Sequence, residues 1–257
     1  MAESRAIRNS SGLPIRFIAS AALAKPPGGH PMAYEVGIAE SGQVPTRADG
    51  EAAWHDYFNA LVWLEFPQTK AAINRRQSEA IAADGISGER GPLRDALTLF
   101  DESAVLFSSR DRSDCRDLQD AEWTHLFVER RDHFERRTRC QVIGHALLHK
   151  LLTPYKAICG HALVIDESSE SVSADRASDI HSDVDADIDA DFAGIGKTNI
   201  DGERIELDRI VSTLISASSF GKDQLTPLPI LGIPGWWSAN SQPEFYNDHR
   251  VFRRRQR

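Results

Sequence analysis

The segment WHDYFNALVWLEFP at residues 54–67 carries three polar side chains at the head of an otherwise apolar stretch. At about 100° per residue on a helix, His55, Asn59 and Asp56 fall at about 0°, 40° and 100°, so they form one contiguous polar sector. A buried polar group without a partner costs roughly 1–3 kcal/mol. These side chains therefore either bond to neighbouring loops or line a cavity whose occupant supplies their partners.

If this sector is a site, its chemistry is proton transfer. His55 would be the general base, because the reference pKa of imidazole, about 6.5, lies near neutrality. Asp56 would orient His55 or a substrate, and Asn59 would donate a hydrogen bond. The next densest charges outside the acidic insert and the charged helix described below are Arg94, Asp95, Asp101 and Glu102.

A second pattern that can carry chemistry is the pair of histidines in GHALLHKLL. His145 and His149 are four residues apart, which places them on one helix face at a spacing that can chelate a metal. The zincin motif needs Glu after the first histidine, where this chain has Ala146. His161 is a candidate third ligand. The alternative is a buried or hydrogen-bonded His145 and a surface His149, so metal binding stays open and no cofactor is predicted.

Two glycine-rich or acidic motifs are not predicted to bind ligands. GIGKT at residues 194–198 resembles a phosphate loop, but Asp191 occupies the first glycine position and DVDADIDAD precedes it. Carboxylates there would repel a phosphate. DVDADIDAD, taken as a calcium loop from Asp185, has Ala190 at position six and Gly196 at position twelve, where the motif needs Gly and Glu. It is interpreted as a solvated acidic linker.

Nucleophilic cysteine or serine chemistry has little support. The chain contains no G-x-S-x-G elbow. Cys159 with His161, or Cys140 with His145, are conceivable pairs, but no local group activates either thiol. The three cysteines form no C-x-x-C pair and are interpreted as small buried hydrophobes, not as a disulfide framework.

The net charge of −8 belongs to one segment. Residues 166–192 carry ten acidic residues and one arginine, so the rest of the chain is nearly neutral. That body gives no electrostatic case for nucleic acid. The segment at 166–192 is predicted to be a disordered insert. The basic end at residues 250–257 is interpreted as solvated; the alternatives are contact with an acidic partner or a phosphate backbone, or pairing with the protein's own insert.

The chain is predicted to be cytoplasmic. No apolar run approaches the roughly 20 residues that a membrane helix needs, so no membrane partner is expected. The apolar run from Ile15 to Ala24 is short and is interrupted by Arg16, unlike the core of a secretory signal.

The element pattern predicts an α+β fold, a mostly helical single domain with a β-hairpin and short strands. The domain comprises residues 1–165 and 193–257 around the insert. Asp49 is the expected N-cap of the helix that carries His55, and Pro67 ends that helix. Expected strands are 13–20, an extended stretch at 33–47, the hairpin 96–100 with 104–109, and 158–166. Expected helices are 68–84, 117–137, 144–152 and 204–216, followed by an irregular C-terminal segment.

Several blocks resemble a known family. The similar blocks are, in order, AYE, VPTR, WHDYFNALVWLEFPQTKAAINRRQ, RDALTLFDES, GHALL, PLPILGIPGWWSAN, FYND and VFR. They resemble the bacterial family of proteins of unknown function numbered 3025. The resemblance covers about Pro14 to Arg253, apart from the insert. It implies a soluble, single-domain bacterial protein and brings no activity with it.

The resemblance indicates where a site would lie. From the polar positions of the blocks, Arg94, Asp95, His145 and Asn240 are taken as candidate ligand-binding residues, beside the catalytic candidates in the opening sector. The family often carries Glu where this chain has His149, which weakens a strict two-histidine metal site. The other polar and aromatic positions in the blocks are Asn74, Asp101, Glu102, Trp236 and Arg253.

Two hypotheses follow. The first is a small-molecule enzyme, a hydrolase or transferase, in which His55 is the base and Arg94 binds an anionic group of the ligand. The alternative is a non-catalytic binding or scaffold protein whose polar motifs are structural. The first requires the side chains of His55 and Arg94 to open into one pocket.

Overall fold

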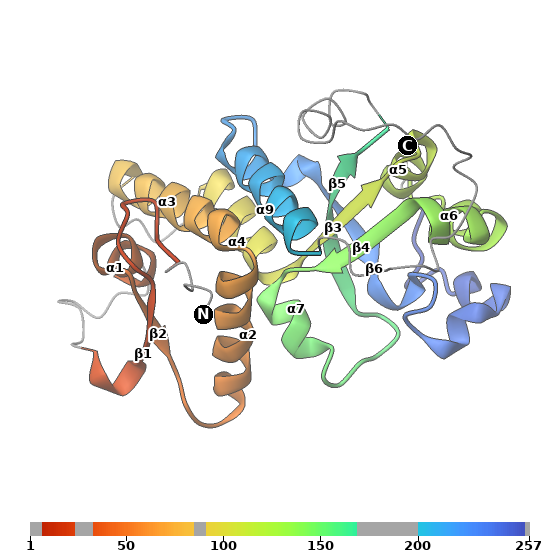
Figure 1. Ribbon diagram of the computed structural model, residues 1–257. Coiled ribbons are helices and arrows are strands. Elements are labelled where there is room, and N and C mark those ends of the chain that lie inside the picture. The colour runs from red at the N-terminus through yellow and green to blue at the C-terminus, as the bar shows by residue number, and fades with distance from the viewer. Residues whose placement is uncertain (1–6, 24–32, 85–90, 169–199, 255–257) are drawn as a thin grey trace. The chain divides into compact units, whose positions relative to one another are not determined.

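The computed structural model describes residues 7–23, 33–84, 91–168 and 200–254 (Figure 1). Its contacts divide the chain into two compact units. Unit 1 comprises Met1–Ala104, Ile143–Leu152 and Asn199–Gln224, and unit 2 comprises Val105–Val142, Thr153–Thr198 and Leu225–Arg257. The GIGKT and DVDADIDAD motifs and most of the insert predicted at 166–192 lie outside the described residues, so those predictions stay predictions.

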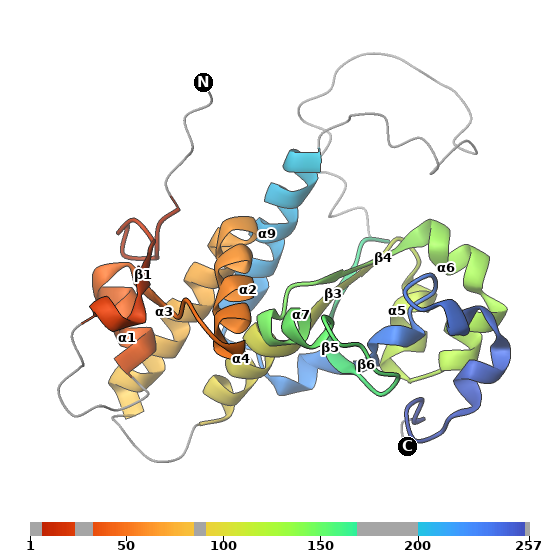
Figure 2. The same ribbon diagram turned by 90° about the horizontal axis from the view of Figure 1, so that it is seen from below.

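Unit 1 is a set of packed helices with one small sheet. In Figures 1 and 2, α3 lies beside α9, and α2 lies beside α7. The short strands β1 and β2 pair in parallel, with Phe17 opposite Val44. Trp63, Ile38 and Val44 form a buried cluster next to this sheet. The elements are β1 (Arg16–Ala19), η1 (Ser20–Ala22), α1 (Ala33–Ser41), β2 (Gln43–Thr46), α2 (Glu51–Glu65), α3 (Pro67–Asp84), α4 (Pro92–Ser103), α7 (His145–Lys150), α9 (Ile200–Ser216) and η3 (Lys222–Gln224).

The N-terminus of α3 is capped from another helix. Asp208 on α9 is 2% exposed, and its carboxylate accepts hydrogen bonds from the backbone N–H groups of Gln68 and Thr69 at 2.9 and 2.8 Å. A carboxylate at this position satisfies free N–H groups and complements the helix dipole. Pro67 separates α2 from α3, as predicted.

Gly144 lets the start of α7 approach the end of α4. A Cβ at this position would lie 2.5 Å from the backbone N of Ala104 and 2.5 Å from Cα of Ser103. Any other residue would force the two backbones apart. The glycine therefore brings His145, the first residue of α7, next to the last turn of α4.

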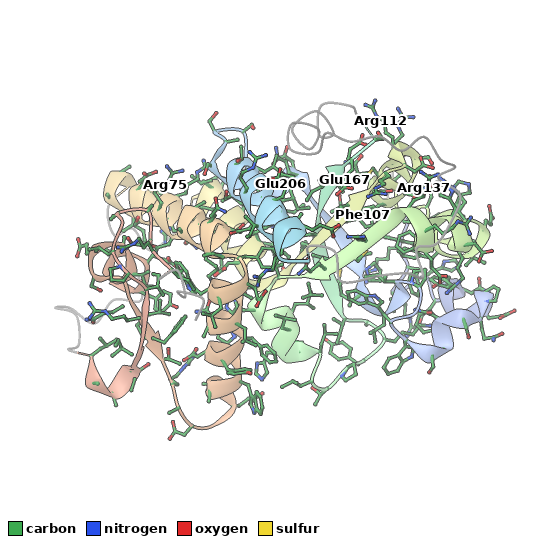
Figure 3. All side chains as sticks on the ribbon, viewed as in Figure 1. Arg75, Phe107, Arg112, Arg137, Glu167 and Glu206 are labelled. Atoms are coloured by element: carbon green, nitrogen blue, oxygen red, sulfur yellow. The ribbon has the colours of Figure 1, made fainter. Side chains whose placement is uncertain are left out.

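Unit 2 is built on a four-stranded sheet in the order β4-β3-β5-β6. Strand β3 pairs antiparallel with β4, and β5 pairs antiparallel with β6. Phe107 on β3, labelled in Figure 3, is fully buried and its ring lies 6.0 Å from that of Phe134. The elements are β3 (Ala104–Ser109), α5 (Arg112–Gln119), the π-helix η2 (His125–Glu129), α6 (Arg131–Arg137), β4 (Thr138–Val142), β5 (Cys159–Asp166), β6 (Leu225–Pro229), η4 (Ile230–Gly232), η5 (Ser238–Ser241) and η6 (Pro243–Asn247).

The helix-rich α+β class is confirmed, and four local predictions are wrong. Residues 96–103 belong to α4, so the hairpin predicted at 96–109 is a helix followed by one strand. Ala96, Leu97 and Phe100 are buried at helical spacing, and such a short apolar run does not distinguish a helix from a strand. Residues 33–41 form α1 instead of an extended segment.

The other corrections concern helix ends. The helix predicted at 117–137 is divided into α5, η2 and α6, with Ala121 at φ 57° between the first two. The N-cap of α2 is Gly50 at φ 70°, with no side-chain cap, and not Asp49. Among the described residues, no helix is both long and apolar enough to cross a bilayer.

Candidate functional site

Two histidines from different helices of unit 1 meet side by side. Nε2 of His145, on α7, lies 3.2 Å from Nε2 of His55, on α2, and the ring centroids are 4.5 Å apart. His145 is 6% exposed, whereas His55 is only partly buried. We call these two residues the histidine pair.

The tautomer of His145 follows from its other neighbour. Its Nδ1 lies 2.7 Å from the backbone carbonyl oxygen of Asp101, at the end of α4. A carbonyl oxygen only accepts hydrogen bonds, so Nδ1 carries the hydrogen and Nε2 of the neutral ring keeps a lone pair. This bond depends on the close approach of α7 to α4 at Gly144. The lone pair of His145 is therefore aimed at His55.

Burial keeps both rings neutral near pH 7. It lowers the pKa of His145 to about 4, against the opposing charge of Asp101. It also lowers the pKa of His55, against the opposing charge of Asp56, and the positive charge of Arg47 lowers it further. A neutral imidazole can accept a proton or bind a metal ion, so the pair has the form that either chemistry needs.

A network of hydrogen-bonded polar side chains is connected to the histidine pair through Asp101. Nζ of Lys70 donates to Oδ1 of Asp101 at 2.5 Å and to Oδ1 of Asn59 at 2.8 Å. Nδ2 of Asn59 donates to the hydroxyl of Tyr34 at 3.0 Å. Burial raises the pKa of Asp101, but the charge of Lys70 and its hydrogen bond oppose this and the net shift is downward. The carboxylate is thus ionised and compensated inside unit 1.

Asp56 is held by an arginine. Its carboxylate accepts from the backbone N, Nε and Nη2 of Arg47 at 2.7, 2.8 and 2.6 Å. The hydrogen bonds and charge of Arg47 outweigh burial and lower the pKa of Asp56. Asp56 and Asn59 therefore tie α2 to the segment after β2 and to α3. The contacts of Asp56 and Asn59 are structural, which is one of the two alternatives that the sequence left open for them.

Arg94 is buried on α4 and acts on a second acid that is only partly buried. Its charge, with that of Lys70, opposes the burial that raises the pKa of Glu35 to about 7. Nδ2 of Asn74 donates to Oε2 of Glu35 at 2.6 Å and to its backbone oxygen at 2.9 Å.

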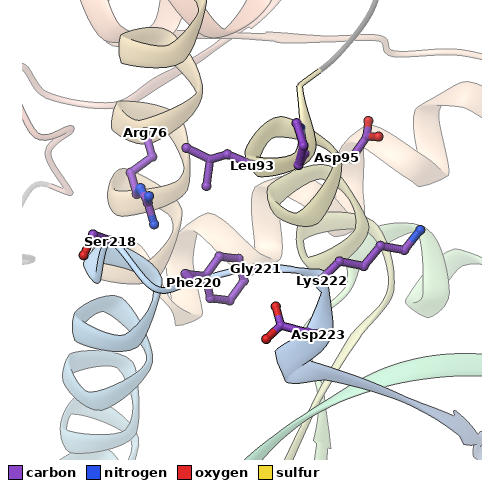
Figure 4. Close-up of a pocket in the computed structure, with 9 residues that line it drawn as sticks. Arg76, Leu93, Asp95, Ser218, Phe220, Gly221, Lys222 and Asp223 are labelled. Carbon is purple, nitrogen blue, oxygen red and sulfur yellow. The ribbon is translucent and has the colours of Figure 1, made fainter.

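Asp95 lines an open pocket of about 500 Å³ between α4 and the end of α9 (Figure 4). Phe220 and Lys222 face the same space. Neither His55 nor Arg94 is among the residues that line it, so this is not the shared pocket that the enzyme hypothesis requires.

Asn240 belongs to unit 2. It is 1% exposed, and its Nδ2 donates to the backbone oxygens of Leu231 and Ile233 at 2.9 and 2.7 Å. These bonds close the irregular C-terminal segment on itself. A ligand role for Asn240 stays a prediction.

Unit 2 has its own polar cluster, which we call the Arg130 cluster. The guanidinium of Arg130 lies 2.7 Å from Asp111, 3.1 Å from Asp114 and 3.5 Å from Asp117. His133 Nε2 lies 2.6 Å from Oδ2 of Asp111. Hydrogen bonds from Ser113, Arg130 and His133 outweigh desolvation and lower the pKa of Asp111.

The Arg130 cluster resembles a cation site in composition only. Ligand atoms of Asp111, Asp114 and His133 lie within 4.8 Å of one another. However, Arg130 already supplies the positive charge at these carboxylates. The π-helix η2 ends at Glu129, so it places Arg130 there. We interpret the cluster as an internal ion-pair network.

Sequence reasoning named His55 and His145 separately but missed their contact. The periodicity of each helix says which residues share its face, but not which face of α2 meets which face of α7. Lys70 and Arg47, which compensate Asp101 and Asp56, were also missed as partners. The only signal in the sequence was that Lys70 and Arg47 both lie within the blocks that resemble the known family.

Comparison with known proteins gives one match. The model of a family described as protein of unknown function, DUF3025, matches residues 15–256. No curated protein and no solved structure matches the chain.

Proposed function

The chain belongs to the DUF3025 family, and because that family brings no known activity with it, we propose a function from the chain's own residues. The proposed function is that of an enzyme, a hydrolase or transferase that acts on a small molecule. Its reaction centre is the histidine pair in unit 1.

The observation that carries this proposal is the 3.2 Å approach of the two Nε2 atoms, with His145 oriented by the carbonyl of Asp101. A histidine with no functional role would not require a second imidazole that is held in one tautomer within hydrogen-bond distance of it. Hydrolases and transferases activate water or a hydroxyl either with an imidazole lone pair or with an ion that imidazoles hold. His55, which is partly exposed, is the member of the pair that can meet a substrate.

The other candidate residues have a more limited part in the proposed reaction than the sequence predicted. Asp56 and Asn59 are positioning residues in this proposal, because they contact Arg47, Lys70 and Tyr34. Arg94 and Asp95 stay candidates for ligand contacts without a demonstrated link to His55. The site is assigned to unit 1 alone.

The test uses the full chain and panels of p-nitrophenyl esters and p-nitrophenyl phosphates. For any substrate that the wild type hydrolyses, we expect His55→Gln and His145→Gln to lower kcat by about 10²-fold or more. His125→Gln is the matched control, since His125 lies in unit 2 and pairs with Asp117. Near-UV circular dichroism checks that each variant is folded. A folded His55→Gln variant with wild-type kcat would contradict the proposal.

The alternative is a non-catalytic binding or scaffold protein. The internal bonding of Asp56 and Asn59 favours it, because these polar groups are fully explained by structure. A wild-type chain that hydrolyses neither panel, while His55→Gln changes only the stability, would favour this alternative.

A further inference from the structure

The histidine pair has the geometry of two ligands of one metal ion. Two imidazole nitrogens bound at 2.0–2.1 Å to a tetrahedral zinc ion lie about 3.4 Å apart. The two Nε2 atoms are 3.2 Å apart. One ion can therefore bridge them once the hydrogen of His55 resides on Nδ1 and the two rings turn so that both Nε2 lone pairs converge on the ion.

The environment of His145 is that of a metal ligand. Ligating histidines usually donate the other ring N–H to a carbonyl or carboxylate, which fixes the ring and raises its basicity. His145 does this through Nδ1 to the carbonyl oxygen of Asp101 at 2.7 Å, and the carboxylate of Asp101 lies 3.7 Å from the same nitrogen.

His149 supplies a third nitrogen. It stands four residues after His145 on α7, the spacing at which two histidines of one helix share an ion. Its ring centroid lies 6.4 Å from that of His55, so metal binding would require the His149 side chain to rotate toward the pair. The site would thus take two ligands from α7 and one from α2, with a fourth position open to solvent.

The surrounding charges are compatible with a cation. Asp101 is paired with Lys70, and Asp56 is paired with Arg47. The negative charge of Glu102, an exposed residue on α4, also acts on His55. Nitrogen ligands select zinc and its transition-metal neighbours over magnesium and calcium, which prefer oxygen.

We infer that His55, His145 and His149 form a binding site for a divalent transition-metal ion of the zinc class. The inference rests on the proposed function only for its catalytic meaning: an ion here would polarise a substrate oxygen or activate a bound water. It differs from the set that the sequence left open, in which His161 was the candidate third ligand.

The test measures metal binding directly. The full chain is stripped with a chelator and titrated with Zn²⁺ by calorimetry and with Co²⁺ by visible absorption. We expect one equivalent of Zn²⁺ and the intense Co²⁺ bands of a tetrahedral site. His55→Gln, His145→Gln and His149→Gln should each lower the association constant at least about tenfold. His161→Gln should leave it unchanged.

The variants separate folding from binding. His149 is partly exposed whereas His145 is buried, so His149→Gln is the variant expected to keep the fold, checked by near-UV circular dichroism. Zinc at less than about a tenth of an equivalent would overturn the inference. So would wild-type affinity in His149→Gln, or a loss in His161→Gln equal to that in His149→Gln.

The two proposals fail differently. If the chain binds no zinc but His55→Gln abolishes turnover, the proposed enzyme stands with an imidazole base and the metal site is wrong. If zinc binds as described and neither substrate panel is turned over, the metal site stands and the proposed enzyme is wrong.

Discussion

The histidine pair and the Arg130 cluster are both partly or fully buried polar groups of their units. They differ in whether their atoms can still bind a ligand. Around Arg130, each of three carboxylates has a positive partner, and the guanidinium has no lone pair to offer. In the histidine pair, the charges behind the rings are compensated by Lys70 and Arg47, but lone pairs remain at the front. A functional site is recognised by lone pairs that can still bind a proton or a metal ion, and not by the density of charge.

The same comparison explains why the acidic cluster is the weaker candidate for an ion. In the Arg130 cluster, carboxylates and a histidine lie close enough together to bind one ion, but Arg130 is already paired with the carboxylates. A metal would have to displace Arg130 and leave its charge unpaired. At the histidine pair, a metal displaces only one hydrogen. Four substitutions test or sharpen this contrast, from the largest expected effect to the smallest.

Arg130→Gln should have the largest effect. It leaves the fully buried Asp114 without its compensating charge, and breaking a buried ion pair from one side costs about 3–5 kcal/mol. The measurement is the free energy of unfolding by urea denaturation. A change below about 1 kcal/mol would show that the cluster is not an internal network, and tighter zinc binding by this variant would reopen it as a cation site.

Glu35→Gln should change how stability depends on pH. The folded pKa of Glu35 is raised from 4.5 to about 7, so between these values the folded state binds more proton than the unfolded state. Stability therefore falls as pH rises through this window, and an amide removes that fall. At pH 8 we expect the variant to be more stable than the wild type by up to roughly 3 kcal/mol, with a much smaller difference at pH 4.

Urea denaturation at pH 4 and pH 8 measures this effect. Glu79→Gln, at an exposed position on the same helix as Lys70, is the control. Asn74 can still donate to the amide oxygen of the new side chain, and the charges that act on Glu35 are those of Asp101, Lys70 and Arg94. An equal difference at both pH values would contradict the raised pKa.

Asn240→Ala should destabilise unit 2 by about 2 kcal/mol, because it leaves the backbone oxygens of Leu231 and Ile233 without their buried donor. Zinc affinity and any turnover should stay at wild-type values in the folded variant. A loss of either, with stability unchanged, would restore Asn240 as a ligand-binding residue. Thermal unfolding and calorimetry provide the two measurements.

Arg112→Gln should have the smallest effect. Its guanidinium lies 3.6 Å from Asp166, but its side chain is 68% exposed, and exposed ion pairs contribute at most about 1 kcal/mol. Unfolding at low and high salt should give nearly the same difference from wild type. An effect as large as that of Arg130→Gln would mean that burial does not distinguish the two arginines.

The sequence by itself determined the helix-rich α+β class, the break between two helices at Pro67, the short helix at His145 and the strand at 159–166. These follow from local periodicity and from proline, which act over one or two turns. The sequence also singled out His55 and His145 individually. It failed at 96–103, where a short apolar run fits a helix and a strand equally well.

Only the tertiary structure decided which of these polar residues act together. His55 and His145 are 90 residues apart and meet because Gly144 admits α7 to the end of α4. Asp208 caps α3 through the backbone N–H of Gln68, which lies 140 residues earlier. The physical reason is that hydrogen bonds and ion pairs depend on angstrom-scale positions, whereas a helical pattern specifies a face without specifying what packs against it.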